Sequence, residues 1–264
     1  MPEPTLTKSV TPDAPVYFIA DAHLGAESEA RETRKSGDLL ELLRMLQDSA
    51  SHVYLVGDIF HFWFEYPYAT AIPHPRVIAS LAALSRSGVQ VHFIGGNHDY
   101  WAGRKLAALT AATVSRRPVQ ADHFGRRLFV AHGDGLPQGD WGYRALKAVI
   151  RSAPAIAAFS LIPPRMGAAI ARWASALSEV TPERVEAATT PMLGFLRDTL
   201  RSGFDAAVVG HVHRQLVVDW EEGTGVIVGD WMSARSVIEL GPEGFRPLTW
   251  SDGELRDARP ADPT

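Results

Sequence analysis

The chain has 264 residues and no cysteine, and its 26 basic and 30 acidic side chains give a formal net charge of −4. The lack of cysteine excludes disulfides, thiolate metal sites, iron–sulfur clusters and a cysteine nucleophile. A hydrophobic fraction of 46% excludes disorder of the whole chain, and the slight acidic excess argues against a general nucleic-acid-binding protein.

The first half of the chain alternates short apolar runs with helical patterns. Residues 1–14 are polar and rich in proline, which predicts a flexible tail. Strands are expected at 16–20, 53–56 and 89–94, separated by helices at 38–48 and 76–86. This alternation predicts an α/β fold whose parallel strands are joined by right-handed crossovers.

The second half of the chain contains a stretch of different character. Residues 140–203 are rich in alanine, interrupted by prolines and without a strand pattern, which predicts a helical cap inserted into the core. Strands are expected on either side of it, at 128–131 and 206–209 and then, as an antiparallel group, at 216–220, 226–228 and 236–240. The core should therefore comprise residues 15–139 and 204–250, followed by a second flexible tail at 251–264.

The location of the protein can also be anticipated from its apolar segments. No apolar run reaches the roughly 18 residues that a membrane span requires. The polar N-terminal segment also lacks the pattern of a signal peptide. We therefore expect a cytoplasmic protein, whose contact with a membrane could only be peripheral.

Five polar clusters follow predicted strands directly. They are Asp21-Ala22-His23, Gly57-Asp58, Gly95-Gly96-Asn97-His98-Asp99, His132-Gly133-Asp134 and Gly210-His211-Val212-His213. Loops at the carboxyl ends of strands in an open α/β sheet converge on one crevice. We therefore expect these side chains to meet although they are distant in sequence.

The chemistry of these clusters favours divalent metal ions. The D-x-H and H-x-H spacings place both side chains on one side of an extended segment. Mixed imidazole and carboxylate ligands suit Mn, Fe, Zn or Co. A carboxylate can also bridge two ions about 3.5–4 Å apart, and Asp58, which follows a glycine at a strand end, is the candidate bridge.

Taken together and in this order, the five motifs resemble the calcineurin-like metallophosphoesterase superfamily. The resemblance runs from residue 21 to residue 213 and implies a two-sheet β-sandwich core flanked by helices. One metal ion would be held by Asp21, His23, Asp58 and His213, and the other by Asp58, Asn97, His132 and His211. A hydroxide bridging the two ions would attack phosphorus in line, with Mn as the expected metal and Fe, Zn or Co as alternatives. The resemblance makes His98 the general acid or transition-state stabiliser, oriented by Asp99.

A narrower resemblance concerns three segments. Residues 57–63 (GDIFHFW), 132–136 (HGDGL) and 140–143 (DWGY) together resemble the UDP-2,3-diacylglucosamine hydrolases of lipid A biosynthesis. This implies cleavage of the substrate's diphosphate to give UMP and lipid X, by a protein peripheral to the cytoplasmic face of the inner membrane. The implied substrate contacts are Asp140, Tyr143, Arg172 and Ser175. The chain departs from the better-known members at His98, where they have arginine, and at Glu179 and Pro182, where polar and basic residues are expected.

The predicted cap itself carries a local charge bias. Five basic residues and no acidic one lie between residues 141 and 178, on a largely apolar background. This combination suits an anionic membrane surface or a lipid diphosphate, although an ordinary helical subdomain remains an alternative. The aromatic side chains at 62–64 and Tyr66 are interpreted either as the lining of an acyl or base pocket or as core. The histidines outside the motifs (His52, His61, His74, His92 and His123) are interpreted as background.

Three other functions remain open at this stage. The same metal site could act on a cyclic nucleotide, a small phosphodiester or a phosphoprotein, although a small substrate does not require an apolar cap. A nuclease is disfavoured, because binding a phosphate backbone needs many basic contacts, so no nucleic-acid partner is expected. A scaffold without catalysis should lack metal ligands, and none is missing from the motifs. The oligomeric state is left open.

Overall fold

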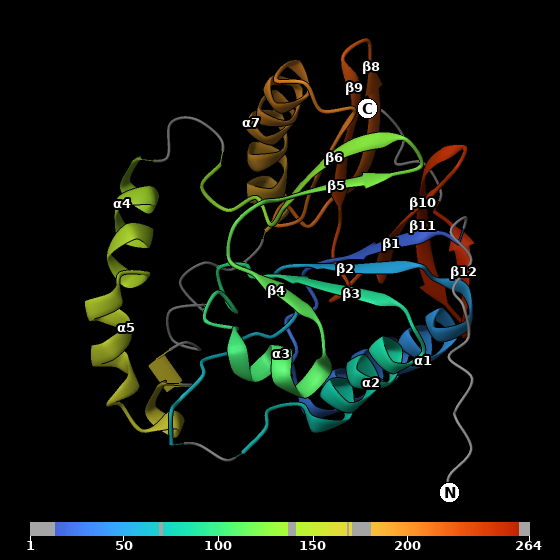
Figure 1. The fold of residues 1–264 in the computed structure, drawn as a ribbon. Coiled ribbons are helices and arrows are strands. Elements are labelled where there is room, and N and C mark those ends of the chain that lie inside the picture. Colours follow the sequence, from blue (N-terminus) through green and yellow to red (C-terminus); the bar gives the residue numbers. More distant parts are fainter. Residues whose placement is uncertain (1–13, 69–70, 137–140, 168, 171–180, 259–264) are drawn as a thin grey trace, which may run out of the picture.

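The computed structural model describes residues 14–68, 71–136, 141–167, 169–170 and 181–258, with only the backbone described at 141–144 and 146. Two β-sheets face each other, and helices lie on their outer sides (Figure 1). The first sheet has the strand order β12 (Glu254–Asp257), β11 (Gly244–Ser251), β10 (Ser236–Gly241), β1 (Val16–Ile19), β2 (His52–Val56), β3 (Gln90–Ile94) and β4 (Thr113–Ser115). The second has the order β5 (Val119–His123), β6 (Arg126–Ala131), β7 (Ala206–Val209), β9 (Gly223–Val228) and β8 (Gln215–Trp220).

The helices are α1 (Glu29–Ser49), α2 (Pro75–Arg86), α3 (Arg104–Thr110), α4 (Trp141–Ile150), α5 (Ala153–Ser160) and α7 (Pro182–Arg201). Helices α1 and α2 cover the outer face of the first sheet, whereas α7 lies on the outer face of the second (Figure 1). Helices α4 and α5 stand to one side of the sandwich (Figure 1). The predicted two-sheet core flanked by helices is confirmed.

The parallel strands of both sheets bring their carboxyl ends to one edge. In the first sheet β1, β2, β3 and β4 are parallel, and in the second β6, β7 and β9 are parallel. Strand β1 is buried on both faces, because Phe18 packs between the sheets and Ile19 packs against the helices. Burial on both faces explains why this strand is an uninterrupted apolar run in the sequence.

The predicted cap at 140–203 is wrong in its second part. Helix α7 presents Met192, Leu196 and Leu200 at helical spacing, and these side chains are buried against Ala207 and Val209 of β7. This helix therefore belongs to the core, whereas α4 and α5 stand apart from the sandwich (Figure 1). Alanine and proline content alone could not separate a projecting helix from one that packs on a sheet.

The predicted flexible tail at 251–264 is also wrong in its first part. Strand β12 pairs antiparallel with β11, with Trp250 opposite Leu255. Asp252 and Gly253 join the two strands and both have positive φ, at 53° and 82°. An Asp-Gly pair favours this type of tight hairpin turn. Residues 1–13 and 259–264 lie outside the described residues, so the tails predicted there stay predictions.

Within the described part of the chain, no helix combines the length and the apolar character that crossing a bilayer would require.

Candidate metal centre

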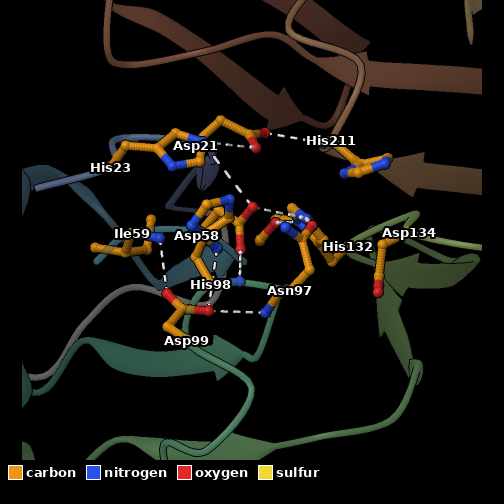
Figure 2. A network of polar contacts seen from close by, with 12 residues as sticks. Asp21, His23, Asp58, Ile59, Asn97, His98, Asp99, His132, Asp134 and His211 are labelled. Carbon is orange, nitrogen blue, oxygen red and sulfur yellow. Dashed lines mark hydrogen bonds and ion pairs between the residues drawn. The ribbon is translucent and has the colours of Figure 1, made fainter. Parts of the chain in front are cut away.

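The five polar motifs meet at the edge of the sandwich where the parallel strands end (Figure 2). Asp21 and His23 follow β1, Asp58 follows β2 and Asn97 follows β3. His132 follows β6, and His211 and His213 follow β7. Both sheets therefore contribute side chains to one site, as the sequence predicted.

The first group of possible ligands surrounds Asp21. Its Oδ1 atom lies 3.4 Å from His213 Nε2 and 3.8 Å from His23 Nε2. The ligand atoms of these three residues all lie within 4.8 Å of one another. They include three of the four residues that the resemblance assigned to one ion.

The second group surrounds His132. Its Nε2 atom lies 3.3 Å from Asp58 Oδ2 and 3.2 Å from Asn97 Oδ1, and His211 completes the group with Asp58. Asp58 Oδ2 also lies 3.9 Å from His23 Nε2 in the first group. Its carboxylate therefore lies between the two groups, in the position expected of a bridging ligand.

The backbone at these residues adopts a conformation that side chains usually avoid. Asp21, His23, Asp58, His211 and His213 all have positive φ, between 42° and 68°. For residues other than glycine this conformation costs of order 1–3 kcal/mol each and is concentrated at functional sites. A side chain at Gly96 would also collide with the site, because its Cβ would lie 2.2 Å from Asp58 Oδ1.

Backbone groups hold two of the ligands in place. His132 Nδ1 lies 2.9 Å from the carbonyl oxygen of Val56, to which it donates, so its Nε2 atom is the one available to the site. The backbone N–H of His211 donates to Asp21 Oδ2 at 2.8 Å. Hydrogen bonds of this kind fix the orientation of metal ligands.

Asp99 has a different role from the predicted one. Its two carboxylate oxygens accept backbone N–H groups from Gly96, Asp58, Ile59 and Phe60 at 2.8–3.2 Å. His98 is instead oriented by a carbonyl, because its Nδ1 lies 3.0 Å from the oxygen of His61. The prediction that Asp99 orients His98 is therefore wrong. Asp99 ties the loop after β2 to the loop after β3, since a carboxylate without a basic partner binds backbone donors well.

His98 itself lies at the centre of the site. Its backbone N–H donates to Asp58 Oδ1 at 2.8 Å, and its ring meets the ring of His23 edge-on at 4.7 Å. The bond from Nδ1 to the carbonyl of His61 places one ring proton on Nδ1. The imidazole is thus held beside both groups of ligands.

The charges of the site are strongly coupled. Burial alone would raise the pKa of Asp58, but the imidazoles of His132 and His98 outweigh it and hold the pKa of Asp58 well below its usual range. Burial opposes a charge on His132, yet the carboxylate of Asp58 raises the pKa of His132 to about 10. Burial and the charge of Asp58 raise the pKa of Asp99 to about 7. A metal ligand must be neutral at its donor nitrogen, so metal binding should release the proton of His132.

The arrangement fits divalent cations. Asp21 Oδ1 and His23 Nε2 are buried, and neither has a hydrogen-bond partner among the described residues. Unpaired buried polar atoms are costly, and a cation between them would satisfy both. The imidazole nitrogens with carboxylate and amide oxygens suit Mn, Fe, Zn or Co.

His61 is a member of the site that the sequence interpretation missed. Ligand atoms of His23, His61 and His98 lie within 4.8 Å of one another, and the rings of His61 and His98 stack at 5.2 Å. Burial, followed by the nearby His98 and His23, lowers the pKa of His61 to about 4. Its place within the 57–63 segment was the only available signal.

The predicted substrate contacts cannot be located in the same way. Asp140, Arg172 and Ser175 lie outside the described residues, as does Glu179. Tyr143 belongs to α4, but its side chain is outside the described set. Pro182 is the first residue of α7 and starts that helix, an ordinary position for proline.

A largely apolar cavity of about 470 Å³ adjoins the centre through His61. Its lining includes the aromatic residues Phe62, Trp63, Phe64, Tyr66 and Tyr68, together with Lys105 and Pro164. Residues 62–64 and Tyr66 thus line a cavity, and the prediction that it takes an acyl chain or a base stays a prediction. Trp63 is at the same time part of the core beneath the first sheet.

Comparison with known proteins identifies the class of this site. The family model described as calcineurin-like phosphoesterase matches residues 14–215. The chain therefore belongs to the calcineurin-like phosphoesterase family, and its Asp, Asn and His groups form the candidate dinuclear metal site of a metal-dependent hydrolase.

Among individual proteins, the chain is similar to UDP-2,3-diacylglucosamine hydrolases. It is 26% identical to that of Nitrosococcus oceani over 261 residues, covering 92% of this chain and 96% of the relative. It is 34% identical to that of Porphyromonas gingivalis over 119 residues, covering 45% of each protein. A solved phosphoesterase from E. coli aligns over 91% of this chain and 96% of its own, with a TM-score of 0.46 and 15% identity.

Proposed function

We propose that the protein hydrolyses the diphosphate of UDP-2,3-diacylglucosamine, giving UMP and lipid X. The observation that carries this proposal is the apolar cavity beside the metal centre, reached through His61. A substrate that joins a diphosphate to two acyl chains needs metal ligands and apolar surface side by side. The similarity to hydrolases of this name over most of the chain supports the same substrate.

The residues of the site have distinct tasks in such a reaction. When bound, the metal ions would lower the pKa of water and neutralise the charge that develops on phosphorus. Asp58 would keep the two ligand groups at a fixed separation, and the Val56 carbonyl would keep His132 Nε2 turned toward the centre. His98, with its Nδ1 proton held on the carbonyl of His61, would stabilise the transition state or protonate the leaving oxygen.

We also propose a peripheral contact with the cytoplasmic face of the inner membrane. Large apolar side chains are exposed on and after α4 and α5: Val149, Ile150, Leu161, Met166 and Ile170, with Leu161 82% exposed. Arg165, among them in sequence, is exposed as well. Apolar groups next to a basic one suit an anionic lipid surface, where a diacylated substrate would be found.

A second candidate is hydrolysis of another phosphodiester or phosphomonoester. The observation that favours it is His98, which matches the general superfamily motif, whereas the better-known diacylglucosamine hydrolases have arginine there. The metal centre would act in the same way on such a substrate, and the cavity would then have another use.

The test is a comparison of substrates. Protein loaded with Mn²⁺ is incubated with UDP-2,3-diacylglucosamine, with UDP-N-acetylglucosamine and with bis(p-nitrophenyl) phosphate, and release of UMP or nitrophenolate is followed. We expect UMP from the diacylated substrate and much slower cleavage of the other two. Hydrolysis of bis(p-nitrophenyl) phosphate without any UMP from the lipid would favour the second candidate. The variant Asp58→Asn is the control for contaminating activity.

A further inference from the structure

Two basic side chains at the end of α4 reach a buried carboxylate beside the metal centre. Lys147 Nζ lies 2.7 Å from Asp134 Oδ2, and Arg151 Nη2 lies 2.8 Å from the same oxygen. Lys147 also donates to the backbone carbonyl of Asp134 at 2.6 Å. Asp134 is the third residue of the H-G-D motif, two positions after His132.

Arg151 joins this motif to a second loop. Its Nη2 donates at 3.2 Å to the carbonyl oxygen of Gly96, the residue before Asn97. Its guanidinium also lies over the ring of Tyr100, with Cζ 3.8 Å from the ring centroid. The planar guanidinium stacks on an aromatic face while its N–H groups donate to a carboxylate and a carbonyl.

The two loops that Arg151 connects carry two ligands of one ion. Asn97 Oδ1 and His132 Nε2 lie 3.2 Å apart, a separation that depends on where their loops sit. Asp134 is buried, with 7% of its side chain exposed, so replacing Lys147 and Arg151 would take two opposite charges away from a buried carboxylate. Such a group is strongly unfavourable, and the loop would have to move to expose it.

We propose that Arg151 and Lys147 are positioning residues for the metal centre. From the inserted segment they clamp Asp134, and Arg151 holds the H-G-D turn at a fixed distance from the G-N-H-D loop. The insertion thereby organises the ion site formed by Asn97 and His132, in addition to any contact with substrate. This inference rests on the metal centre and does not depend on the lipid being the substrate.

The test measures metal binding directly. Binding of Mn²⁺ to Arg151→Met, Arg151→Lys and the wild type is titrated by calorimetry and by the electron paramagnetic resonance signal of free Mn²⁺. We expect Arg151→Met to lower the affinity for one of the two ions by about 10–100-fold, the range typical for partners of metal ligands. The affinity for the other ion should stay within about twofold of the wild type. Arg151→Lys should be intermediate, because it keeps the charge and loses the planar group that lies over Tyr100.

The kinetic readout uses bis(p-nitrophenyl) phosphate, so that it is independent of the lipid. We expect the activity lost in Arg151→Met to return as the Mn²⁺ concentration rises, which loss of a catalytic group would not allow. Asp134→Asn should lower the affinity for the same ion. In the double variant with Arg151→Met, the fold-loss of affinity should be smaller than the product of the two single losses. Arg44→Met removes an exposed arginine of α1 and should leave binding unchanged.

Two outcomes would overturn the proposal. One is wild-type affinity for both ions in Arg151→Met. The other is an equal effect of Arg151→Met and Arg44→Met. If circular dichroism shows that Arg151→Met does not fold, the same Mn²⁺ titrations of Arg151→Lys and Lys147→Met test the proposal instead. A failure of lipid hydrolysis in the wild type would leave these results untouched and would count only against the proposed function.

Discussion

The ammonium group of Lys35, on α1, donates a hydrogen bond to the backbone carbonyl of His23 at 3.0 Å. Lys35 is fully buried and also pairs with Glu27 at 3.3 Å and with Glu32 at 3.0 Å. The turn that carries Asp21 and His23 is therefore tied to the helix that follows it.

We predict that Lys35→Met destabilises the protein by about 3 kcal/mol, because it leaves two carboxylates and the His23 carbonyl without their cation. Chemical denaturation measures this change. Arg31→Met is the matched control, since Arg31 also approaches Glu27, at 3.9 Å, but is 77% exposed. An exposed pair contributes under about 1 kcal/mol. Similar losses in both variants would show that burial of Lys35 has no special effect.

Asp58→Asn should abolish hydrolysis while the fold is retained. The carboxylate lies between the two ligand groups, 3.3 Å from His132 Nε2 and 3.9 Å from His23 Nε2, and the amide would lose its charge and one coordinating oxygen. Metal analysis should find fewer than two ions per chain. Near-normal turnover with two ions bound would remove Asp58 from the bridging role.

His98→Gln should lower kcat by roughly 10²–10⁴-fold and leave metal content unchanged, as expected for a general acid or a transition-state stabiliser. Glutamine keeps a side-chain donor near the His61 carbonyl, so the loop should stay in place. Kinetics and metal analysis of the same preparation give both readouts. A parallel fall of metal content and kcat would assign His98 to metal binding instead.

Leu161→Glu should weaken binding to vesicles of anionic phospholipid and leave cleavage of bis(p-nitrophenyl) phosphate unchanged. The reason is the burial of an exposed apolar side chain at the lipid surface, which a carboxylate opposes. Co-sedimentation with vesicles measures binding. Gln90→Glu adds a charge at the start of β3, an exposed position at the opposite end of the sandwich, and should bind as the wild type does. Equal binding by Leu161→Glu would contradict the membrane contact.

Acid should destabilise the protein through a second histidine cluster, formed by His52 and Tyr54 of β2, His92 of β3 and His123 at the end of β5. His52 Nδ1 lies 3.1 Å from His92 Nε2, and Tyr54 Oη lies 2.8 Å from His123 Nε2. Burial, with His52 nearby, lowers the pKa of His92 and of His123 to about 4.

The sign of the effect follows from the ordinary histidine pKa of about 6.5. Between pH 6.5 and 4 the unfolded chain binds protons that the folded chain does not. The free energy of unfolding that this cluster contributes is therefore complete above pH 6.5 and decreases as the pH falls toward 4. His92→Gln should flatten this dependence. Denaturant unfolding of both proteins at several pH values measures it, and identical slopes in the two would contradict the role of His92.

The meeting of the candidate metal ligands was predictable from sequence because each follows a predicted strand, and parallel strands bring their carboxyl ends together. The strands β1, β2, β6 and β7 were predicted from short apolar runs, which burial on both faces produces, whereas β3 has an apolar pattern that Gln90 and His92 interrupt. Strand β5, by contrast, alternates partly buried with exposed residues at a sheet edge, and such short runs carry little signal.

The contacts that organise the site were not predictable. Lys35 and Arg151 are ordinary charged residues in sequence, and their importance comes from distant segments that they meet in space. Asp99 was assigned correctly to the site but to the wrong partner, because its neighbour in sequence is His98 whereas its carboxylate lies under the loop after β2. His61 was interpreted as background because it lies three residues after Asp58, a spacing that does not mark a ligand.

The left-handed backbone at Asp21, His23, Asp58, His211 and His213 has a consequence for engineering this scaffold. Glycine at each of these positions would remove the backbone strain but also the ligand side chain. The most stable sequence and the most active sequence therefore differ at these positions. Selection for thermal stability alone should therefore favour glycine at these positions and give a folded protein without activity.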